Sequence, residues 1–287
     1  MTYNDRPEND FSELALCIRD TAPTITRNGE ITLVSLMSPI SFYKPSVPTN
    51  SIDVGLCFSS LHYLQKQELS GQKSRTFANT DDEIFAAAAH EDLVQFLRLR
   101  AAEIKSGGTL LACMPAARED PSNLLCKEAV KNSLVGMIRE GKVPASAVSK
   151  MRPAVFARKL HQVEAVLADT VDHWEKVACW NNFVELPGFA KVEAAKQSGD
   201  EANHLQASRD WAKACAGWFV SVLGGFLMQA MRVEKFGNEA YDRSSDEDSI
   251  EKSILDEWQI RLEQTMLQDA RDVEFRLDYV FFCLRRK

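Results

Sequence analysis

Short apolar runs and a long amphipathic stretch follow one another in the first 115 residues. Residues 52–58 and 109–114 are mainly apolar runs bounded by turn signals, a pattern typical of strands buried in a parallel sheet. Between them, apolar positions recur at helical spacing from about Thr80 to Lys105 and stop at Gly107. Strand, helix and strand in this order predict a βαβ unit, and therefore a parallel sheet.

Two shorter strands are predicted ahead of this unit. Residues 31–37 are rich in β-branched and apolar side chains and lie between an Asn-Gly turn and Pro39. Tyr3 to Asp5 has the pattern of the last residues of a strand. A short helix is expected over residues 11–19.

Beyond Pro115 the pattern becomes mainly helical. The predicted helices cover 122–140, a stretch from about Pro153 to Leu167, 204–235, and a last helix after the acidic segment 238–257. Strand-like patterns return at 174–186 and 273–284. The chain therefore combines a sheet with a large helical part.

One helical segment resembles a membrane span. No charged residue occurs from Ala214 to Met231, and this length approaches that of a span. Glycine, serine and glutamine interrupt it, however, and Asp210, Lys213 and Arg232 flank it closely. The pattern favours a buried helix over a span.

Composition narrows the classes of function. The net charge of −7 over 287 residues, with a pI near 5.4, argues against a surface that binds nucleic acid or anionic membranes. Seven cysteines are scattered without metal-ligand spacing, which is typical of reduced core cysteines in a cytoplasmic protein. The acidic, polar N-terminus does not read as a signal peptide.

Polar side chains follow the strand at 52–58. Ser59, His62 and Tyr63 come where a parallel strand reaches its carboxyl end, the edge at which open α/β sheets bind ligands. A histidine in this place is either structural or part of a ligand site, and this stretch alone does not decide between the two.

Five short sequences, in their order along the chain, resemble the SABATH family of carboxyl methyltransferases, which methylate salicylate, jasmonate and related acids. They are Asn4 to Phe11 (NDRPENDF), Ser41 to Tyr43 (SFY), Ser59 to Leu64 (SSLHYL), Phe96 to Gly108 (FLRLRAAEIKSGG) and Arg118 to Pro121 (REDP). Together they extend the resemblance over roughly the first 140 residues.

The resemblance implies an α/β fold, namely a Rossmann-like class I methyltransferase sheet, N-terminally truncated, with a mostly helical cap. On this basis we assign 1–114, 170–190 and 272–287 to the sheet domain. Residues 115–169 and 191–271 are assigned to the cap, which is the substrate region.

The resemblance also implies that the cofactor is S-adenosylmethionine. Position by position, Asp5 matches the carboxylate that holds the ribose hydroxyls, and Arg6 lies beside the adenine. Ser41 and Phe42 match the pair that contacts the adenosine. Ser59, where the plant enzymes often have tyrosine, is assigned to the same cofactor site.

The acceptor implied by the resemblance is a small-molecule carboxylate. His62 and Tyr63 match the His-Trp pair that grips this carboxylate in the family. Trp218, on the long apolar helix, either lines the acceptor pocket or belongs to the core. A carboxylate is already deprotonated at pH 7, so methyl transfer needs alignment and desolvation but no catalytic base, and we predict no metal site.

The sequence departs from the family at one point. It contains no glycine-rich cofactor loop after a first strand, and in the family that strand lies between the strand ending at Asp5 and the strand at Ile52. The chain is then a truncated product, closes its sheet by direct pairing, or has lost methyl transfer. Two functions follow: a carboxyl (or related O/N) methyltransferase, or a non-catalytic relative that binds or dimerises. A homodimer is compatible with both.

Overall fold

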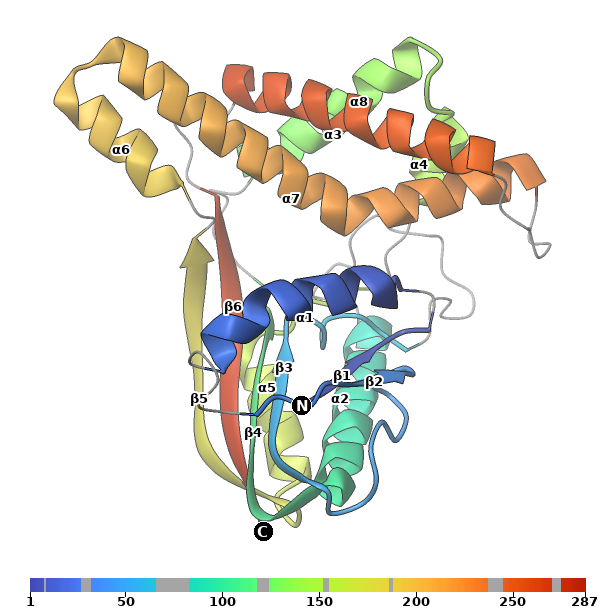
Figure 1. Ribbon diagram of the computed structural model, residues 1–287, viewed down its shortest axis with the longest axis vertical. Coiled ribbons are helices and arrows are strands. Elements are labelled where there is room, and N and C mark those ends of the chain that lie inside the picture. Colours follow the sequence, from blue (N-terminus) through green and yellow to red (C-terminus); the bar gives the residue numbers. More distant parts are fainter. Residues whose placement is uncertain are drawn as a thin grey trace.

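The computed structural model describes residues 1–7, 9–26, 32–65, 83–117, 124–151, 155–185, 188–236, 245–269 and 275–287. A sheet domain forms one end of the molecule, and a layer of helices forms the other (Figure 1). The predicted helix start at Thr80 and the motif at 118–121 lie outside the described residues.

The sheet domain is built on four strands in the order β3–β4–β6–β5. These are β3 (Ile52–Phe58), β4 (Ile104–Pro115), β6 (Arg276–Arg286) and β5 (Trp174–Glu185). β3 and β4 run parallel and are joined through α2 (Glu83–Glu103), so the predicted βαβ unit is confirmed. β6 pairs antiparallel with both of its neighbours.

Two helices cover one face of this sheet. Leu93, Phe96 and Leu97 of α2 are buried with sheet residues such as Leu110 and Phe282. The second helix is α5 (Leu160–Asp169), which contributes further buried residues to the same cluster and lies behind the strands in Figure 1.

The position of α5 corrects our domain boundaries. We assigned 160–169 to the cap, but this segment packs on the sheet. The reason is its apolar stripe: Val163, Val166 and Leu167 all face one side of the helix and are buried beside Trp174. The helix also begins later than predicted, because residues 155–158 are extended and form bridges to Tyr63 and Ala116.

The opposite face of the sheet is more open. Val54, Leu56 and Phe58 of β3 are each more than half exposed. On the same sheet, Trp180 and Phe281 stack at a ring distance of 5.4 Å. The helix α1 (Phe11–Ile25) crosses in front of the strands in Figure 1 without burying these side chains.

The two N-terminal strands form a small sheet of their own. β1 (Thr2–Asp5) pairs in parallel with β2 (Leu36–Pro39). β2 is shorter than the predicted 31–37 strand and shifted along the chain, because β1 offers only four residues to pair with. Among the described residues neither strand pairs with β3, so the sheet is not closed by direct pairing.

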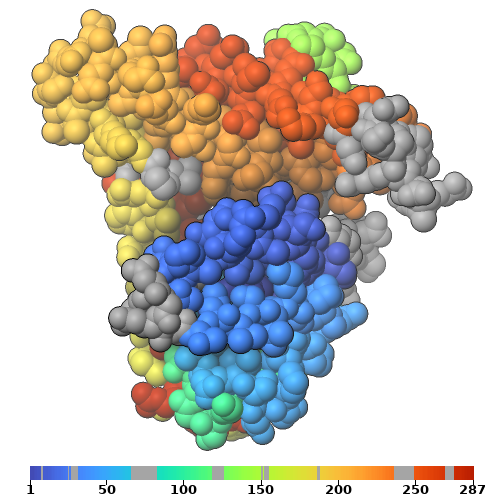
Figure 2. Space-filling model, viewed as in Figure 1, coloured from blue at the N-terminus to red at the C-terminus, as the bar shows by residue number. Residues whose placement is uncertain are grey.

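The predicted 11–19 helix is confirmed and extends to Ile25. Its N-terminus is fixed by Asp10, whose Oδ1 accepts hydrogen bonds from the backbone N–H groups of Ser12 (2.8 Å) and Glu13 (3.1 Å). In the space-filling view, α1 forms the surface between the cap and the segment that leads to β3 (Figure 2).

The cap has its own core. It comprises α3 (Leu124–Arg139), α4 (Ala145–Lys150), α6 (Phe189–Ser198), α7 (Glu201–Phe236) and α8 (Ser245–Asp269). Trp211 and Trp258 are fully buried between these helices, and Trp258 Nε1 donates to Ser133 Oγ at 3.0 Å. α7 contains the apolar stretch discussed above. Residues 201–235 are long and apolar enough to cross a membrane, but half of their most apolar window is buried inside the protein.

Candidate cofactor and acceptor site

The small sheet carries the first candidate residues to its carboxyl edge. Asp5 lies opposite Pro39 in the register, two residues before Ser41. Asn4 fixes this arrangement, because its Nδ2 donates to the carbonyls of Ser38 (2.9 Å) and Ile40 (2.7 Å). Sequence reasoning assigned no role to Asn4, and only the pairing of the two strands reveals one.

Asp5 has an open carboxylate. Its Oδ1 accepts one hydrogen bond, from the backbone N–H of Arg6 at 2.8 Å, and the side chain is exposed. Within the described residues, Oδ2 accepts none. The carboxylate is therefore free to accept hydrogen bonds from a ligand that carries hydroxyl groups.

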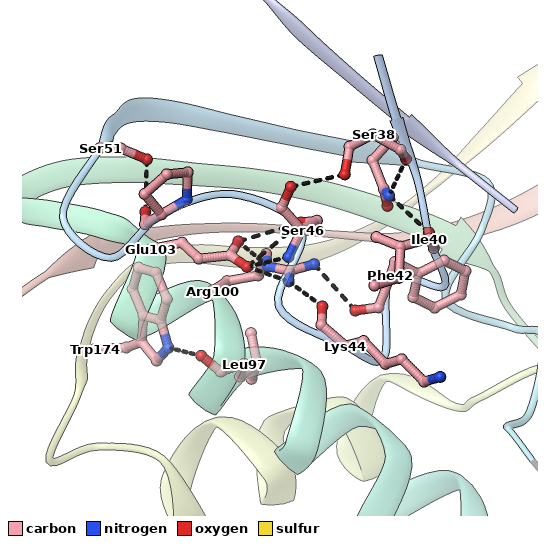
Figure 3. A network of polar contacts seen from close by, with 12 residues as sticks. Ser38, Ile40, Phe42, Lys44, Ser46, Ser51, Leu97, Arg100, Glu103 and Trp174 are labelled. Atoms are coloured by element: carbon pink, nitrogen blue, oxygen red, sulfur yellow. Dashed lines mark hydrogen bonds and ion pairs between the residues drawn. The ribbon is translucent and has the colours of Figure 1, made fainter. Parts of the chain in front are cut away.

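The loop that carries Ser41 and Phe42 is held from behind by α2 (Figure 3). Arg100 donates from Nη1 to the Phe42 carbonyl and from Nη2 to the Lys44 carbonyl, each at 3.0 Å. Gln95 Nε2 donates to the carbonyl between them, that of Tyr43, also at 3.0 Å. Three consecutive carbonyls are thus bound by side chains of one helix.

Arg100 is itself held by a buried carboxylate. Arg100 and Glu103 form an ion pair at 2.8 Å, and their side chains are only 10% and 5% exposed. Glu103 Oε1 also accepts from the backbone N–H of Ser46 at 2.7 Å (Figure 3). A buried pair of this kind fixes geometry, because neither charge can leave without stranding the other.

The chain turns out of the sheet at Ser59. Its φ of 56° lies in the left-handed region, which is rare for a residue with a side chain. The Ser59 N–H donates to the Cys113 carbonyl at 2.9 Å, and its hydroxyl lies 2.9 Å from that of Tyr279 on β6. These contacts direct the following turn toward the edge of the sheet.

The turn at residues 61–63 is held as firmly as the loop. The Leu61 carbonyl accepts from Arg158 Nη1, and the His62 carbonyl accepts from the Phe156 N–H at 2.8 Å. The Tyr63 carbonyl accepts from the hydroxyl of Tyr43 at 2.7 Å. Their side chains are thereby set in fixed positions.

His62 is electrically neutral at pH 7. Burial, together with the nearby positive charge of Arg158, lowers the pKa of His62 to about 4. Asp92 and the Tyr43 side chain favour the charged form of Arg158 against the effect of its burial, so Arg158 acts on His62 as a cation. The buried His62 Nδ1 has no hydrogen-bond partner among the described residues.

Tyr63 joins the site to the cap. Its ring stacks on Phe226 of α7 with a centroid distance of 6.3 Å. Burial raises the pKa of the Tyr63 hydroxyl, and the charge of Arg6 opposes this, so the end of β1 and the turn influence each other electrostatically. The structure therefore associates Asp5 and Arg6, the 41–44 loop and the 61–63 turn.

Trp218 is placed differently. Its ring packs against Phe219 at 5.0 Å and Phe275 at 5.5 Å, within the cluster of the cap. Phe226, two helical turns further along α7, is the residue that contacts Tyr63. Helical spacing alone does not distinguish these aromatic residues, and the assignment of Trp218 to the acceptor pocket stays a prediction.

The described residues contain no group of three or more His, Cys, Asp or Glu arranged to hold a metal ion. Carboxylate, hydroxyl and aromatic groups lie near the carboxyl ends of parallel strands in the two sheets, with a neutral histidine and a tyrosine beside them. Such a set can bind a nucleoside and orient a second small molecule.

This fold and this edge define the class of the protein as a Rossmann-like, class I methyltransferase. The structure is similar to that of loganic acid methyltransferase with SAH, with a TM-score of 0.58 and 18% sequence identity, over 100% of this chain and 73% of that one. The chain belongs to the family of SAM dependent carboxyl methyltransferases, whose model matches residues 1–246. The resemblance, the fold class and the cofactor, S-adenosylmethionine, are thereby confirmed.

Relatives occur in fungi and plants. Methyltransferase FUS9 of Gibberella fujikuroi is 27% identical over 291 residues, which cover all of this chain and 77% of that protein. Indole-3-acetate O-methyltransferase 1 of Arabidopsis thaliana is 27% identical over 189 residues, 58% of this chain and 49% of that protein. These relatives support a methyltransferase, and the roles of individual residues stay predictions.

Proposed function

We propose that this protein methylates the carboxylate of a small organic acid. In this proposal Asp5, Arg6, Ser41, Phe42 and Ser59 form the cofactor side of the site, and His62 and Tyr63 form the acceptor side. The observation that supports it is the connection of three segments: β1 ends opposite Pro39, just before the loop at 41–44, and this loop is hydrogen-bonded to the turn at 61–63 through Tyr43.

The residues present suit S-adenosylmethionine. The Asp5 carboxylate has an oxygen open to the two ribose hydroxyls, and the half-buried ring of Phe42 leaves part of its surface for an adenine. S-adenosylmethionine, when bound, supplies a methyl group on a positively charged sulfur. No residue of the chain has to form a covalent bond.

The chain's own residues act by orientation and desolvation. A carboxylate with a pKa of about 4 is ionised at neutral pH and needs no base. Donors from the His62 imidazole and the Tyr63 hydroxyl would hold it in one orientation, and the Phe226 ring would exclude water from its side.

The neutral state of His62 matters for this role. An imidazolium would pair with the acceptor carboxylate as an ion pair and reduce its nucleophilicity. A neutral imidazole with a pKa of about 4 instead donates one hydrogen bond and leaves the negative charge on the acceptor. The low pKa therefore supports an orienting function.

The nature of the acceptor follows from the same surroundings. Tyr63 and Phe226 place aromatic surface next to the two donors. This supports an acid with a planar or apolar body, the class to which indole-3-acetate, named for the Arabidopsis relative, belongs. The alternative of a non-catalytic binding partner is not favoured by the family of the chain.

Calorimetric titration of the full chain with S-adenosylhomocysteine tests the cofactor side. We expect saturable binding that Asp5→Ala weakens at least about tenfold, because the hydroxyls of the ribose lose a charged acceptor. Asp20→Ala is the matched control, since Asp20 is exposed and, among the residues that the structure describes, pairs with its neighbour Arg19 on α1 alone.

The outcomes separate clearly. If both variants bind as the unmodified chain does, Asp5 is not a cofactor ligand. If the folded chain does not bind at all, the proposed function is wrong.

Two further points remain proposals. The acidic charge and the cysteines, all of which are free thiols, support a cytoplasmic location. A homodimer is tested by light scattering on the protein as it leaves a size-exclusion column. A measured mass equal to that of one chain would exclude the homodimer.

A further inference from the structure

Six backbone carbonyls form two matched sets at this site. In the first set, residues 42, 43 and 44 are held by Arg100 and Gln95. In the second, residues 61, 62 and 63 are held by Arg158, Phe156 and Tyr43. The first set belongs to the proposed cofactor loop and the second to the proposed acceptor turn.

Tyr43 is the residue that belongs to both. Its own carbonyl is anchored to α2 by Gln95, while its hydroxyl donates to the Tyr63 carbonyl at 2.7 Å. The side chain is 5% exposed, and its ring lies 4.5 Å from that of Phe42. A short hydrogen bond in such a dry place transmits a shift of one segment to the other.

The other anchors link the two segments less directly. Arg100 and Gln95 come from α2 and hold the loop, and Gln95 Oε1 also accepts a hydrogen bond from Gln65 Nε2 at 3.1 Å, two residues after the turn. Arg158 holds the Leu61 carbonyl and the Ala89 carbonyl of α2, so it ties the turn to the scaffold, and its charge also acts on the Tyr43 side chain. The Tyr43 hydroxyl is thus a direct connection between loop and turn.

We infer that Tyr43 is a positioning residue that couples the occupancy of the cofactor loop to the order of the acceptor turn. This inference rests on the proposed function. A cofactor that binds against Phe42 restricts the motion of the loop. Because the Tyr43 hydroxyl is hydrogen-bonded to the Tyr63 carbonyl, the motion of the turn is then restricted as well. The acceptor donors on His62 and Tyr63 are then fixed only when the cofactor side is filled.

Hydrogen exchange measured by mass spectrometry on the full chain tests the coupling, with S-adenosylhomocysteine as the probe. In the unmodified protein the probe should slow exchange in peptides covering 40–46 and 60–64, each by about fivefold or more, the lower end of common coupling strengths. In Tyr43→Phe the slowing at 40–46 should persist and that at 60–64 should fall below about twofold. A merely structural role would raise exchange with and without the probe alike.

Tyr279→Phe is the matched control. Tyr279 is also buried, at 7% exposure, and its hydroxyl makes one hydrogen bond of 2.9 Å at the same edge, to Ser59. It does not connect the loop to the turn. We expect this variant to keep the ligand-dependent slowing at 60–64.

Each result decides a different question. Slowing at 60–64 that survives Tyr43→Phe refutes the coupling through this hydroxyl. Slowing at 40–46 alone in the unmodified protein also refutes it, and needs no variant that might alter folding. Absence of binding to the unmodified, folded chain contradicts the proposed function itself, and a calorimetric titration of the same sample identifies that case.

Discussion

The pKa of His62 makes the stability of this protein depend on pH in a specific way. Burial and the charge of Arg158 lower this pKa to about 4 in the folded state, against an ordinary value of 6.5. Between these two values the unfolded chain binds a proton that the folded chain does not. Folding stability contributed by the neutral imidazole is therefore present at pH 7 and is lost as the pH falls through this interval.

The magnitude follows from the two pKa values. One unit of difference corresponds to about 1.4 kcal/mol, so the loss from pH 7 amounts to about 2 kcal/mol at pH 5 and about 3 kcal/mol at pH 4. Carboxylates elsewhere also respond to acid. The informative quantity is therefore the difference between the unmodified protein and His62→Gln, which cannot take up this proton.

Urea unfolding of both proteins at pH 7 and pH 5 measures this difference. The unmodified protein should lose about 2 kcal/mol more than His62→Gln over this range. His161→Gln replaces an exposed histidine on α5 and should follow the unmodified protein. Equal pH slopes for the unmodified protein and His62→Gln would refute a neutral, desolvated His62.

Two further predictions concern the scaffold behind the site. Arg100→Met should lower the free energy of unfolding, measured with urea, by about 3–5 kcal/mol, because it leaves the buried Glu103 carboxylate without its partner. The double variant with Glu103→Met should lose less stability than the sum of the two single variants. Additive losses would contradict a coupled pair. Leu110→Ala should cost about 2–5 kcal/mol because Leu110 is buried between sheet and helices, whereas Leu56→Ala, at 57% exposure, should cost less than about 1 kcal/mol. Similar costs for the two leucines would mean that the open face of β3 is covered in solution.

Local pattern was sufficient for the elements that depend mainly on their own residues. The strands β3 and β4 form at the two apolar runs, and α2 forms at the stretch with helical spacing between them. The sequence predicts these elements because side chains close in sequence decide which stripe of an element is apolar and becomes buried. Short motifs likewise located Asp5, the 41–43 loop and the 61–64 turn, since a turn or strand end is encoded by a few neighbouring residues.

The pattern of apolar and polar residues did not predict an element correctly where its position depends on a partner that is distant in sequence. The strand predicted at 31–37 is replaced by β2 at Leu36–Pro39, because these are the residues that lie opposite Thr2–Asp5 and pair with them. The same holds for α5. Its apolar stripe could pack equally well on the helices of the cap or on the sheet, and the contact with Trp174 in the folded chain places it on the sheet.

At the candidate site, short motifs predict which residue types follow the ends of the strands. How these residues are held depends on contacts between distant parts of the chain. Arg100 is more than 50 residues away in sequence from the carbonyls of Phe42 and Lys44 that it binds, and Arg158 is nearly 100 residues away from that of Leu61. No sequence pattern predicts contacts at these separations. The low pKa of His62 and the link between Tyr63 and Tyr43 arise from burial and from contacts between residues far apart in sequence, because electrostatic and hydrogen-bond energies depend on distance in space and not on distance along the chain.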